Sequence, residues 1–352
     1  MTYRHGESGF SLIEVMVAMT LLLVVSAIAT TALMQMTSSQ STIWNRTQMH
    51  SGVRGATELL QQEVGQAGRL GLSATVSLTA PVTASPTCDP GTPTLNAVTV
   101  GVVSRDASGT VVTSVNGINP LTGIFADPAG PSYILLTTMD GDQQESFKVA
   151  SVNPAGSTIT ACFTKDHLAG TVLLPLGSFA TGIIPPTGML NGSTASVLKL
   201  YGDVNGDGNM VYVEYTCDPL VPGSPPTNTP PGTGNLYRNV MPFDATSKPA
   251  VTGAEVLLSN VLPNPGGTPC FTYQVTPPLI VQGTPFTFVL DVAITLTVQT
   301  EQIDPVTRQF QTETKALLNV SPRNVFNAWM LAGMSYTDRI QSTPASVTSL
   351  LP

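Results

Sequence analysis

The stretch FSLIEVMVAMTLLLVVSAIATTALM, residues Phe10 to Met34, decides the fold of this chain. It follows a polar segment, MTYRHGESG, and its apolar character is almost unbroken. At about 1.5 Å of rise per residue, roughly 25 residues form a helix about 37 Å long, which exceeds the ~30 Å hydrocarbon core of a bilayer. An ordinary secretory signal peptide has an apolar region of only about 7–15 residues. The stretch therefore predicts one tilted helix that spans a membrane.

One acidic residue, Glu14, interrupts the apolar stretch near its start. A carboxylate within a span costs about 2.5–3.5 kcal/mol on insertion scales, so acidic residues there are generally functional and have a partner. A plain membrane anchor leaves Glu14 unexplained. Arg4 precedes the span and the next positively charged residue is Arg46, which predicts that the first nine residues stay in the cytoplasm while the bulk of the chain crosses the membrane.

The segment Gly9-Phe10-Ser11-Leu12-Ile13-Glu14 resembles the processing site of type IV prepilins and type II secretion pseudopilins. In that family a dedicated membrane peptidase cuts after the glycine and methylates the new N-terminus. The resemblance implies that residues 1–9 are a leader, that cleavage falls between Gly9 and Phe10, and that Phe10 is N-methylated. It also implies that Glu14, the fifth mature residue, pairs with the terminal amine of a neighbouring subunit and sets the register of assembly. Opposite charges attract strongly in a low dielectric, whereas either alone is expensive to bury.

A second helical pattern continues the first. We expect residues 10–34 to form the membrane and filament-core helix, and residues 35–71 to form its amphipathic continuation, ending at about Gly68 or Gly71. The segment from Glu58 to Gly68 resembles the helix end of larger minor pilins and J-type pseudopilins. The predicted apolar stripe, which we expect to pack against the rest of the protein, is Met49, Val53, Ala56, Leu60, Val64 and Ala67.

The remainder reads as a β-rich head. The chain has 31 Gly and 29 Pro, and only 10% of its residues are charged, which favours many short strands joined by turns. Two long runs, Phe286–Thr300 and Arg308–Val320, predict an antiparallel hairpin. Shorter predicted strands are Ala97–Val103, Tyr133–Thr138, Ser146–Ser151, Ser157–Phe163 and Thr194–Leu200. The expected fold class is α+β: a long N-terminal helix on an antiparallel, sheet-rich head (72–325), followed by a C-terminal tail (326–352).

Three further segments bear on this head. Asn235-Leu236-Tyr237-Arg238 and Ser321-Pro322-Arg323-Asn324-Val325 resemble parts of PilW-like minor pilins. The stretch Pro222–Gly234 is rich in Pro, Gly and Thr, and we expect it to be a mobile surface loop.

The four cysteines all fall in the part predicted to lie outside the cytoplasm, where disulfides form and persist. The sequence allows three pairings, and we favour Cys217 with Cys270 and Cys88 with Cys162. Zinc is the alternative, but the chain has no CxxC pair and the spacings are wide for a structural site.

One motif predicts calcium binding. The run from Asp203 to Asn209, followed by Glu214, fits the D-x-[DN]-x-[DN]-G-x5-E loop at every defined position. Its ligands would be Asp203, Asn205, Asp207, the backbone carbonyl of Asn209, and Glu214. The flanking segments read as strands and not as the helices of an EF-hand, so a metal-free hairpin turn is an equal alternative. Calcium is the one cofactor that the sequence suggests.

These observations limit the function. The net charge of -8 argues against nucleic acid as the main ligand, and the three histidines form no catalytic pattern, so we expect no enzyme activity. The resemblance implies a structural minor pilin of a type IV pilus, acting in assembly, priming or at the tip. The alternatives are a J-type pseudopilin of a type II secretion system and a membrane-anchored, calcium-stabilised adhesin. Expected partners are other pilin subunits, the prepilin peptidase, the inner-membrane assembly platform and inner-membrane lipid. The expected location is the inner membrane with the head in the periplasm, and then the pilus or cell surface.

Overall fold

The computed structural model describes residues 11–89, 94–124, 134–218, 232–243, 245–281, 283–336 and 339–350. The predicted leader, Phe10 and most of the predicted Pro222–Gly234 loop lie outside these residues. The chain divides into two compact units: Met1–Ser51 with Gln299–Glu313, and Gly52–Val298 with Thr314–Pro352.

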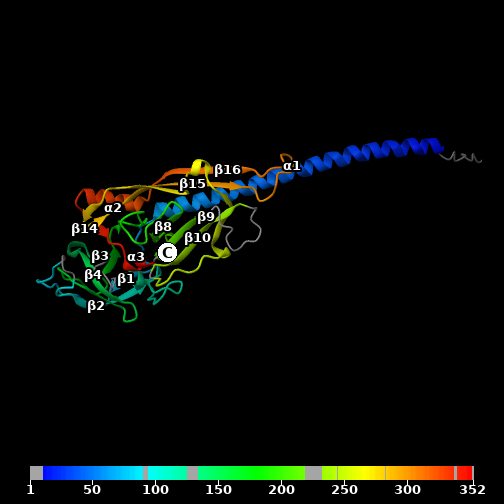
Figure 1. The fold of residues 1–352 in the computed structure, drawn as a ribbon. Coiled ribbons are helices and arrows are strands. Elements are labelled where there is room, and N and C mark those ends of the chain that lie inside the picture. The colour runs from blue at the N-terminus through cyan, green and yellow to red at the C-terminus, as the bar shows by residue number, and fades with distance from the viewer. Residues whose placement is uncertain are drawn as a thin grey trace, which may run out of the picture. The chain divides into compact units, whose positions relative to one another are not determined.

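The first helix, α1, runs from Leu12 to Gln66 (Figure 1). It confirms the predicted continuation of the apolar helix into an amphipathic one. Within the second unit, five members of the predicted stripe are at most 2% exposed, namely Val53, Ala56, Leu60, Val64 and Ala67.

The helix ends where the backbone needs glycine. Gly68 has φ +79°, a left-handed conformation that costs little without a Cβ, and its N–H donates to the carbonyl of Tyr201 at 2.8 Å. A Cβ on Gly182 would lie 2.2 Å from the Cα of Gly68. The helix end and the segment before β8 therefore approach each other too closely for any other residue at position 182.

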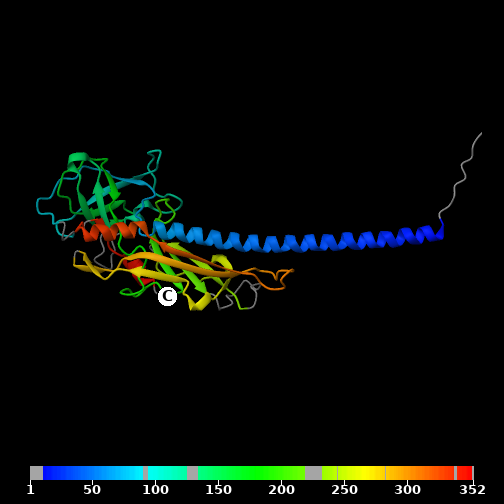
Figure 2. The same ribbon diagram turned by 90° about the horizontal axis from the view of Figure 1, so that it is seen from above.

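Six strands form a closed antiparallel barrel in the order β1-β2-β5-β4-β3-β6, drawn as cyan and green arrows in Figures 1 and 2. Alternate residues of β5 point inward, so Ile159 and Ala161 are buried while their threonine neighbours are partly exposed. These inward residues pack with Phe147, Phe163 and Leu173 in one apolar core. The strands are β1 Thr75–Leu78, β2 Val98–Arg105, β3 Ile134–Thr138, β4 Ser146–Asn153, β5 Thr158–Ala161 and β6 Val172–Pro175.

A seven-stranded sheet makes up most of the rest of the head. Its order is β12-β15-β11-β10-β9-β8, and β16 pairs with β15. The β15–β16 pair is the predicted hairpin, with shorter strands and a longer connection than expected. The strands are β8 Val197–Gly202, β9 Val211–Asp218, β10 Gly234–Pro242, β11 Val256–Leu262, β12 Phe271–Val275, β15 Val289–Gln299 and β16 Thr312–Val320. Together with α1 and the barrel, this sheet confirms the α+β class.

Short elements complete the chain. Two small sheets pair β13 (Leu279–Val281) with β14 (Thr284–Phe286), and β17 (Ile340–Gln341) with β7 (Ser178–Phe179). The 3-10 turns are η1 Pro120–Gly123, η2 Gly141–Gln143, η3 Gly253–Glu255 and η4 Pro265–Gly267.

The C-terminal residues differ from the expected tail. Helix α2 spans Arg323–Gly333 and buries Val325, Ala328 and Ala332, and helix α3 spans Ala345–Ser349. Val347, in α3, belongs to the core cluster that contains Tyr201 and Tyr212. The described residues between 326 and 350 therefore belong to the head, because their apolar side chains pack in its core.

Two disulfides link the head. Cys88 pairs with Cys162 and Cys217 pairs with Cys270, with Cα–Cα distances of 5.6 and 6.4 Å. These are the two pairings that the sequence analysis favoured. The first ties the segment after β1 to the residue following β5, and the second ties β9 to the residue preceding β12.

Candidate functional site

The start of α1 carries a helix cap built from Ser11 and Glu14. The backbone N–H of Ser11 donates to Oε2 of Glu14 at 3.1 Å, and the N–H of Ile13 donates to the Ser11 hydroxyl at 3.4 Å. The first amides of a helix have no partners within it, and its N-terminal end is electropositive, so a carboxylate in the first turn is stabilised there. Glu14 thus lies beside the backbone that immediately follows the predicted cleavage point.

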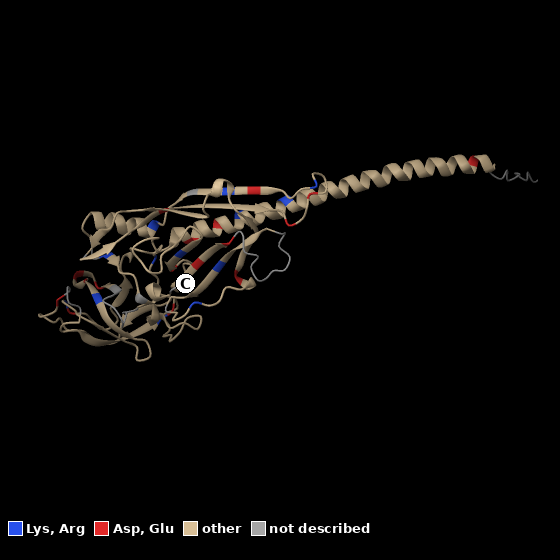
Figure 3. Ribbon diagram, viewed as in Figure 1, with Lys and Arg blue, Asp and Glu red and all other residues tan. Residues whose placement is uncertain are grey.

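The helix beyond this cap presents an apolar surface, which is almost unbroken as far as Met34. One 18-residue window in α1 has a mean hydropathy of 2.5, and none of it is buried. Large apolar side chains are exposed from Leu12 to Trp44, and no charged residue occurs between Glu14 and Arg46. Figure 3 shows this stretch of α1 as uniformly tan. Such a surface requires lipid or another apolar partner.

Within the first unit, the connection between β15 and β16 contacts residues 42–50 of α1. Asp304 accepts a hydrogen bond from the Thr42 hydroxyl at 3.1 Å, and its side chain also caps the turn through the N–H groups of Val306 and Thr307. Three more side-chain contacts follow along α1: Arg46 with Gln311, Gln48 with Glu301, and His50 with Glu313. We call this set of four contacts the hairpin clasp.

A buried ion pair fixes α1 to the sheet in the second unit. Glu63 is 2% exposed, and its carboxylate accepts hydrogen bonds from Arg238 of β10 and from the Tyr215 hydroxyl of β9. Burial and the neighbouring Glu63 charge raise the pKa of Tyr215, so its hydroxyl remains a donor. Segment 235–238 and the predicted helix end, residues 58–68, therefore meet at this pair.

The predicted calcium loop connects β8 to β9, but its five residues do not form one ligand set. Asp203 is 1% exposed; its Oδ1 accepts from the Gly208 N–H at 3.1 Å and its Oδ2 lies 3.5 Å from Nε of Arg69. Asp207 caps the turn by accepting from the Asn209 N–H at 2.9 Å.

Glu214 points away from this turn, because it lies within β9 opposite Lys199 of β8. Its Oε1 is 2.7 Å from Nζ of Lys248 and accepts from the Tyr212 hydroxyl at 2.7 Å. Among the described residues no group of three or more His, Cys, Asp or Glu side chains is placed to hold a metal ion. The bidentate carboxylate that the calcium pattern needs is thus engaged elsewhere, and the loop fits the metal-free hairpin turn better.

Comparison with known proteins bears on the N-terminal segment. Residues 4–30 match the model of the prokaryotic N-terminal methylation motif. This motif indicates a type IV pilin-like or pseudopilin protein. No curated protein and no solved structure matches the chain. For a pilin-like chain, the motif implies interaction with other pilin subunits and with the prepilin peptidase, and the exposed apolar helix is consistent with membrane anchoring.

The matched residues include the predicted processing site. Gly9 and Phe10 themselves lie outside the described residues, and cleavage, methylation and the pairing of Glu14 with a neighbouring amine stay predictions. What the structure adds is the position of Glu14 in the first turn of α1, with its carboxylate directed at the backbone N–H of Ser11.

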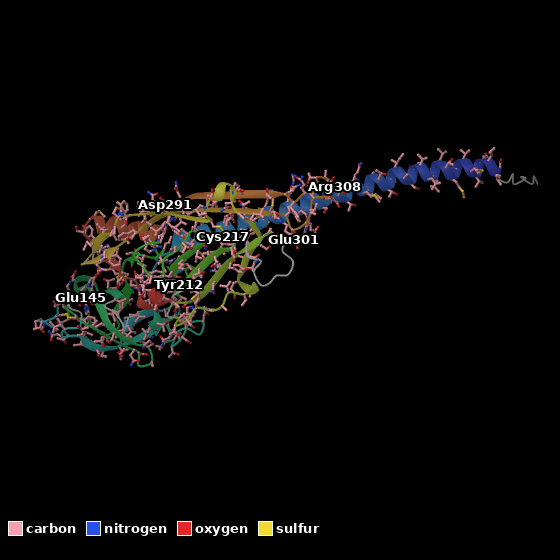
Figure 4. The ribbon with its side chains drawn as sticks, viewed as in Figure 1. Glu145, Tyr212, Cys217, Asp291, Glu301 and Arg308 are labelled. Atoms are coloured by element: carbon pink, nitrogen blue, oxygen red, sulfur yellow. A yellow bond between two sulfur atoms is a disulfide. The ribbon has the colours of Figure 1, made fainter. Side chains whose placement is uncertain are left out.

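Two buried polar clusters in the head were not predicted from the sequence. In the first, the buried imidazole of His167 lies between Asp140, at 2.5 Å from Nδ1, and Glu145, at 2.7 Å from Nε2. The three residues form no recognisable sequence pattern. Asp140 and Glu145 lie in the turn between β3 and β4, and His167 lies between β5 and β6, so the fold of the barrel brings them together. Figure 4 labels Glu145 in this part of the barrel. The second cluster surrounds Lys199 and is developed below.

Proposed function

We propose that the protein is a minor pilin of a type IV pilus, acting in assembly, priming or at the tip, and that it acts by packing and not by catalysis. The observation that carries this proposal is the exposed apolar surface of α1 that starts at Glu14 and coincides with the methylation motif. Before assembly this surface is buried in the inner membrane, with the head in the periplasm. In the filament the same surface is buried against neighbouring pilin helices, and Glu14 pairs with a neighbour's methylated N-terminal amine.

The size of the head supports a minor role. About four fifths of the 352 residues follow α1. A head of this size, with a barrel beside a seven-stranded sheet, is harder to repeat at every position of a thin fibre than a small one.

A J-type pseudopilin of a type II secretion system is the second candidate, since it shares the N-terminal chemistry and also has a large head. A membrane-anchored, calcium-stabilised adhesin is a weaker third candidate, because Glu214 is paired with Lys248. Loss of surface binding on calcium chelation, with filaments intact, would favour this third candidate.

The first experiment is intact mass and N-terminal sequencing of the protein from its native membrane, in the wild type and in a strain without the prepilin peptidase. We expect a methylated Phe10 as the first residue in the wild type and retention of residues 1–9 in the mutant strain. An unprocessed chain in both strains would refute the pilin proposal.

A second experiment tests the register role of the carboxylate. Glu14→Gln removes the charge while preserving shape. Glu58→Gln is the matched control on the same helix, because Glu58 pairs with the exposed Arg54. We expect Glu14→Gln to be processed and yet absent from sheared filaments, whereas Glu58→Gln is incorporated normally. Equal incorporation of both variants would contradict the role of Glu14. Co-purification with secretion filaments and not with pili would identify the pseudopilin alternative.

A further inference from the structure

A lysine, an asparagine and a glutamate are buried together in the head. Lys199 of β8 is 3% exposed, Asn191 is fully buried, and Glu214 of β9 is 3% exposed. Nζ of Lys199 donates to Oδ1 of Asn191 at 2.7 Å and lies 3.9 Å from Oε1 of Glu214. A buried lysine ammonium is expensive to desolvate, so its placement against a neutral amide calls for an explanation.

The orientation of the Asn191 amide is fixed by its other contacts. Its Nδ2 donates to the carbonyl of Val347 at 2.8 Å and to the hydroxyl of Tyr212 at 3.0 Å, which leaves Oδ1 facing the lysine. The Tyr212 hydroxyl in turn donates to Oε1 of Glu214 at 2.7 Å. Tyr212 therefore bridges the glutamate and the amide nitrogen, and Figure 4 labels it among the strands of the sheet.

The surroundings make the Lys199 ammonium easier to deprotonate than an exposed lysine. Burial lowers the pKa of Lys199; the Glu214 charge opposes this shift and the nearby Lys248 adds to it. Tyr212 and Val347 belong to an apolar cluster with Phe179, Ile184 and Tyr201, which keeps water from the amide. An amine held against a carbonyl, with a carboxylate in reach and water excluded, has the parts needed for acyl transfer.

We propose that Lys199 and Asn191 form an intramolecular isopeptide bond without the help of another enzyme. The Lys199 ammonium gives a proton to Glu214, and the neutral Nζ attacks Cγ of Asn191. The C–N bond to Nδ2 then breaks as that nitrogen takes a proton relayed from Glu214 through the Tyr212 hydroxyl, and Glu214 recovers a proton from the new amide nitrogen. The products are a secondary amide and ammonia, which leaves as ammonium with the Glu214 proton, and no oxidant or cofactor is consumed.

The bond would close a ring of nine residues, 191–199, and tie the segment before β8 to the strand itself. It also replaces a buried ammonium with a neutral amide, which removes the cost of burying that charge. This cross-link is independent of the filament in which the protein serves.

Trypsin digestion of the full-length protein, purified from its native membrane and then reduced and alkylated, provides the test. Trypsin cleaves after Lys165, Lys199 and Arg238, so an unmodified chain gives peptides 166–199 and 200–238. We expect instead one peptide, 166–238, lighter by one ammonia, because an acylated lysine is not cleaved. Fragment ions from within the ring, 191–199, should be missing from its mass spectrum.

Variants identify the groups involved. Lys199→Arg and Asn191→Ala should each restore a chain without the loss of ammonia, and Glu214→Gln should prevent the loss by removing the proton acceptor. Lys248→Arg is the matched control, since Lys248 contacts the same carboxylate and keeps its charge as arginine. We expect Lys248→Arg to retain the cross-link.

The wild-type digest decides the question even if a variant fails to fold. Separate peptides 166–199 and 200–238 would overturn the proposal. Conversion of Asn191 to Asp, which its glycine neighbour at position 192 promotes, would overturn it too if Lys199 is still cleaved. A cross-link that maps to another residue pair would show that the hydrogen-bonded arrangement of Lys199 and Asn191 is a resting contact only.

Discussion

The ion pair between Glu63 and Arg238 gives the sharpest test of how α1 is attached to the head. Arg238→Gln would leave the Glu63 carboxylate, whose side chain is 3% exposed, without its cationic partner. Breaking a buried pair in this way costs about 3–5 kcal/mol. The Arg238 side chain is 24% exposed, so solvent screens part of the interaction and we expect a value near the lower limit, about 3 kcal/mol. For a unit of this size, with an unfolding entropy of about 2.1 cal/mol/K per residue, that loss corresponds to roughly 5 °C in the unfolding midpoint.

The assay is thermal unfolding of the full-length protein in detergent, followed by near-ultraviolet circular dichroism with the disulfides kept oxidised. Arg54→Gln is the control, because Arg54 pairs with Glu58 on the exposed face of the same helix and its loss should leave the midpoint unchanged. Adding Glu63→Gln to Arg238→Gln should recover part of the lost stability, since it removes the orphaned charge and keeps an acceptor for Tyr215. Equal midpoints for Arg238→Gln and Arg54→Gln, or a double variant less stable than Arg238→Gln, would refute this reasoning.

Three further predictions address other parts of the head. Burial alone would raise the pKa of Asp140, but hydrogen bonds from His167 and Thr138 and the His167 charge hold it below the ordinary 3.8. Asp140 therefore contributes its full stabilisation above pH 3.8, and this contribution is lost as the pH falls through its lowered pKa. In acid titrations the free energy of unfolding should fall less steeply for Asp140→Asn than for the wild type. Replacing Cys217 and Cys270 with alanine should lower the free energy of unfolding by about 4 kcal/mol, because the bridge closes a separation of 53 residues; an unchanged denaturation midpoint would argue against the entropic account. Gly182→Ala should abolish accumulation of folded protein, since its Cβ would lie 2.2 Å from Gly68, whereas Gly55→Ala meets nothing within 4 Å and should be tolerated in protease-resistance assays.

The parts of the fold that follow local rules were predictable from the sequence. The apolar run and the three-and-four spacing from Val53 to Ala67 predicted α1, and its buried face agrees. The β-rich runs predicted β2, β3, β4, β5 and β8 within a few residues, and they predicted the hairpin of β15 and β16. They did not give the other strands, such as β1, β6 and β10–β14. Each of these signals comes from periodicity within one segment.

The parts that depend on distant residues were not predictable in this way. Nothing in the run from Val325 to Met334 distinguishes a loose tail from a helix whose small residues pack in the core, and the structure shows the helix α2. The division of the head into a barrel and a seven-stranded sheet depends on which strands pair, which turn signals do not specify.

The candidate functional residues also fall into those that a local pattern predicts and those that only the fold brings together. The N-terminal motif is contiguous, so its residues could be named from the sequence alone. The calcium pattern was matched at every position, yet strand alternation directs Glu214 to Lys199 and Lys248 instead of the turn. The cluster of Asn191, Lys199 and Glu214 joins a loop and two strands, and no sequence pattern links its members.

The hairpin clasp has a mechanical consequence. Its contacts fall on α1 at Thr42, Arg46, Gln48 and His50, in successive turns of one helix. A tensile load applied along α1 would strain these contacts in parallel and in shear, so several must yield together before the helix can slide past the turn. The part of α1 that precedes Thr42, which begins at Leu12, then has a fixed length of about 45 Å at ~1.5 Å per residue. That length sets how deeply the subunit can be embedded while its hairpin turn stays engaged.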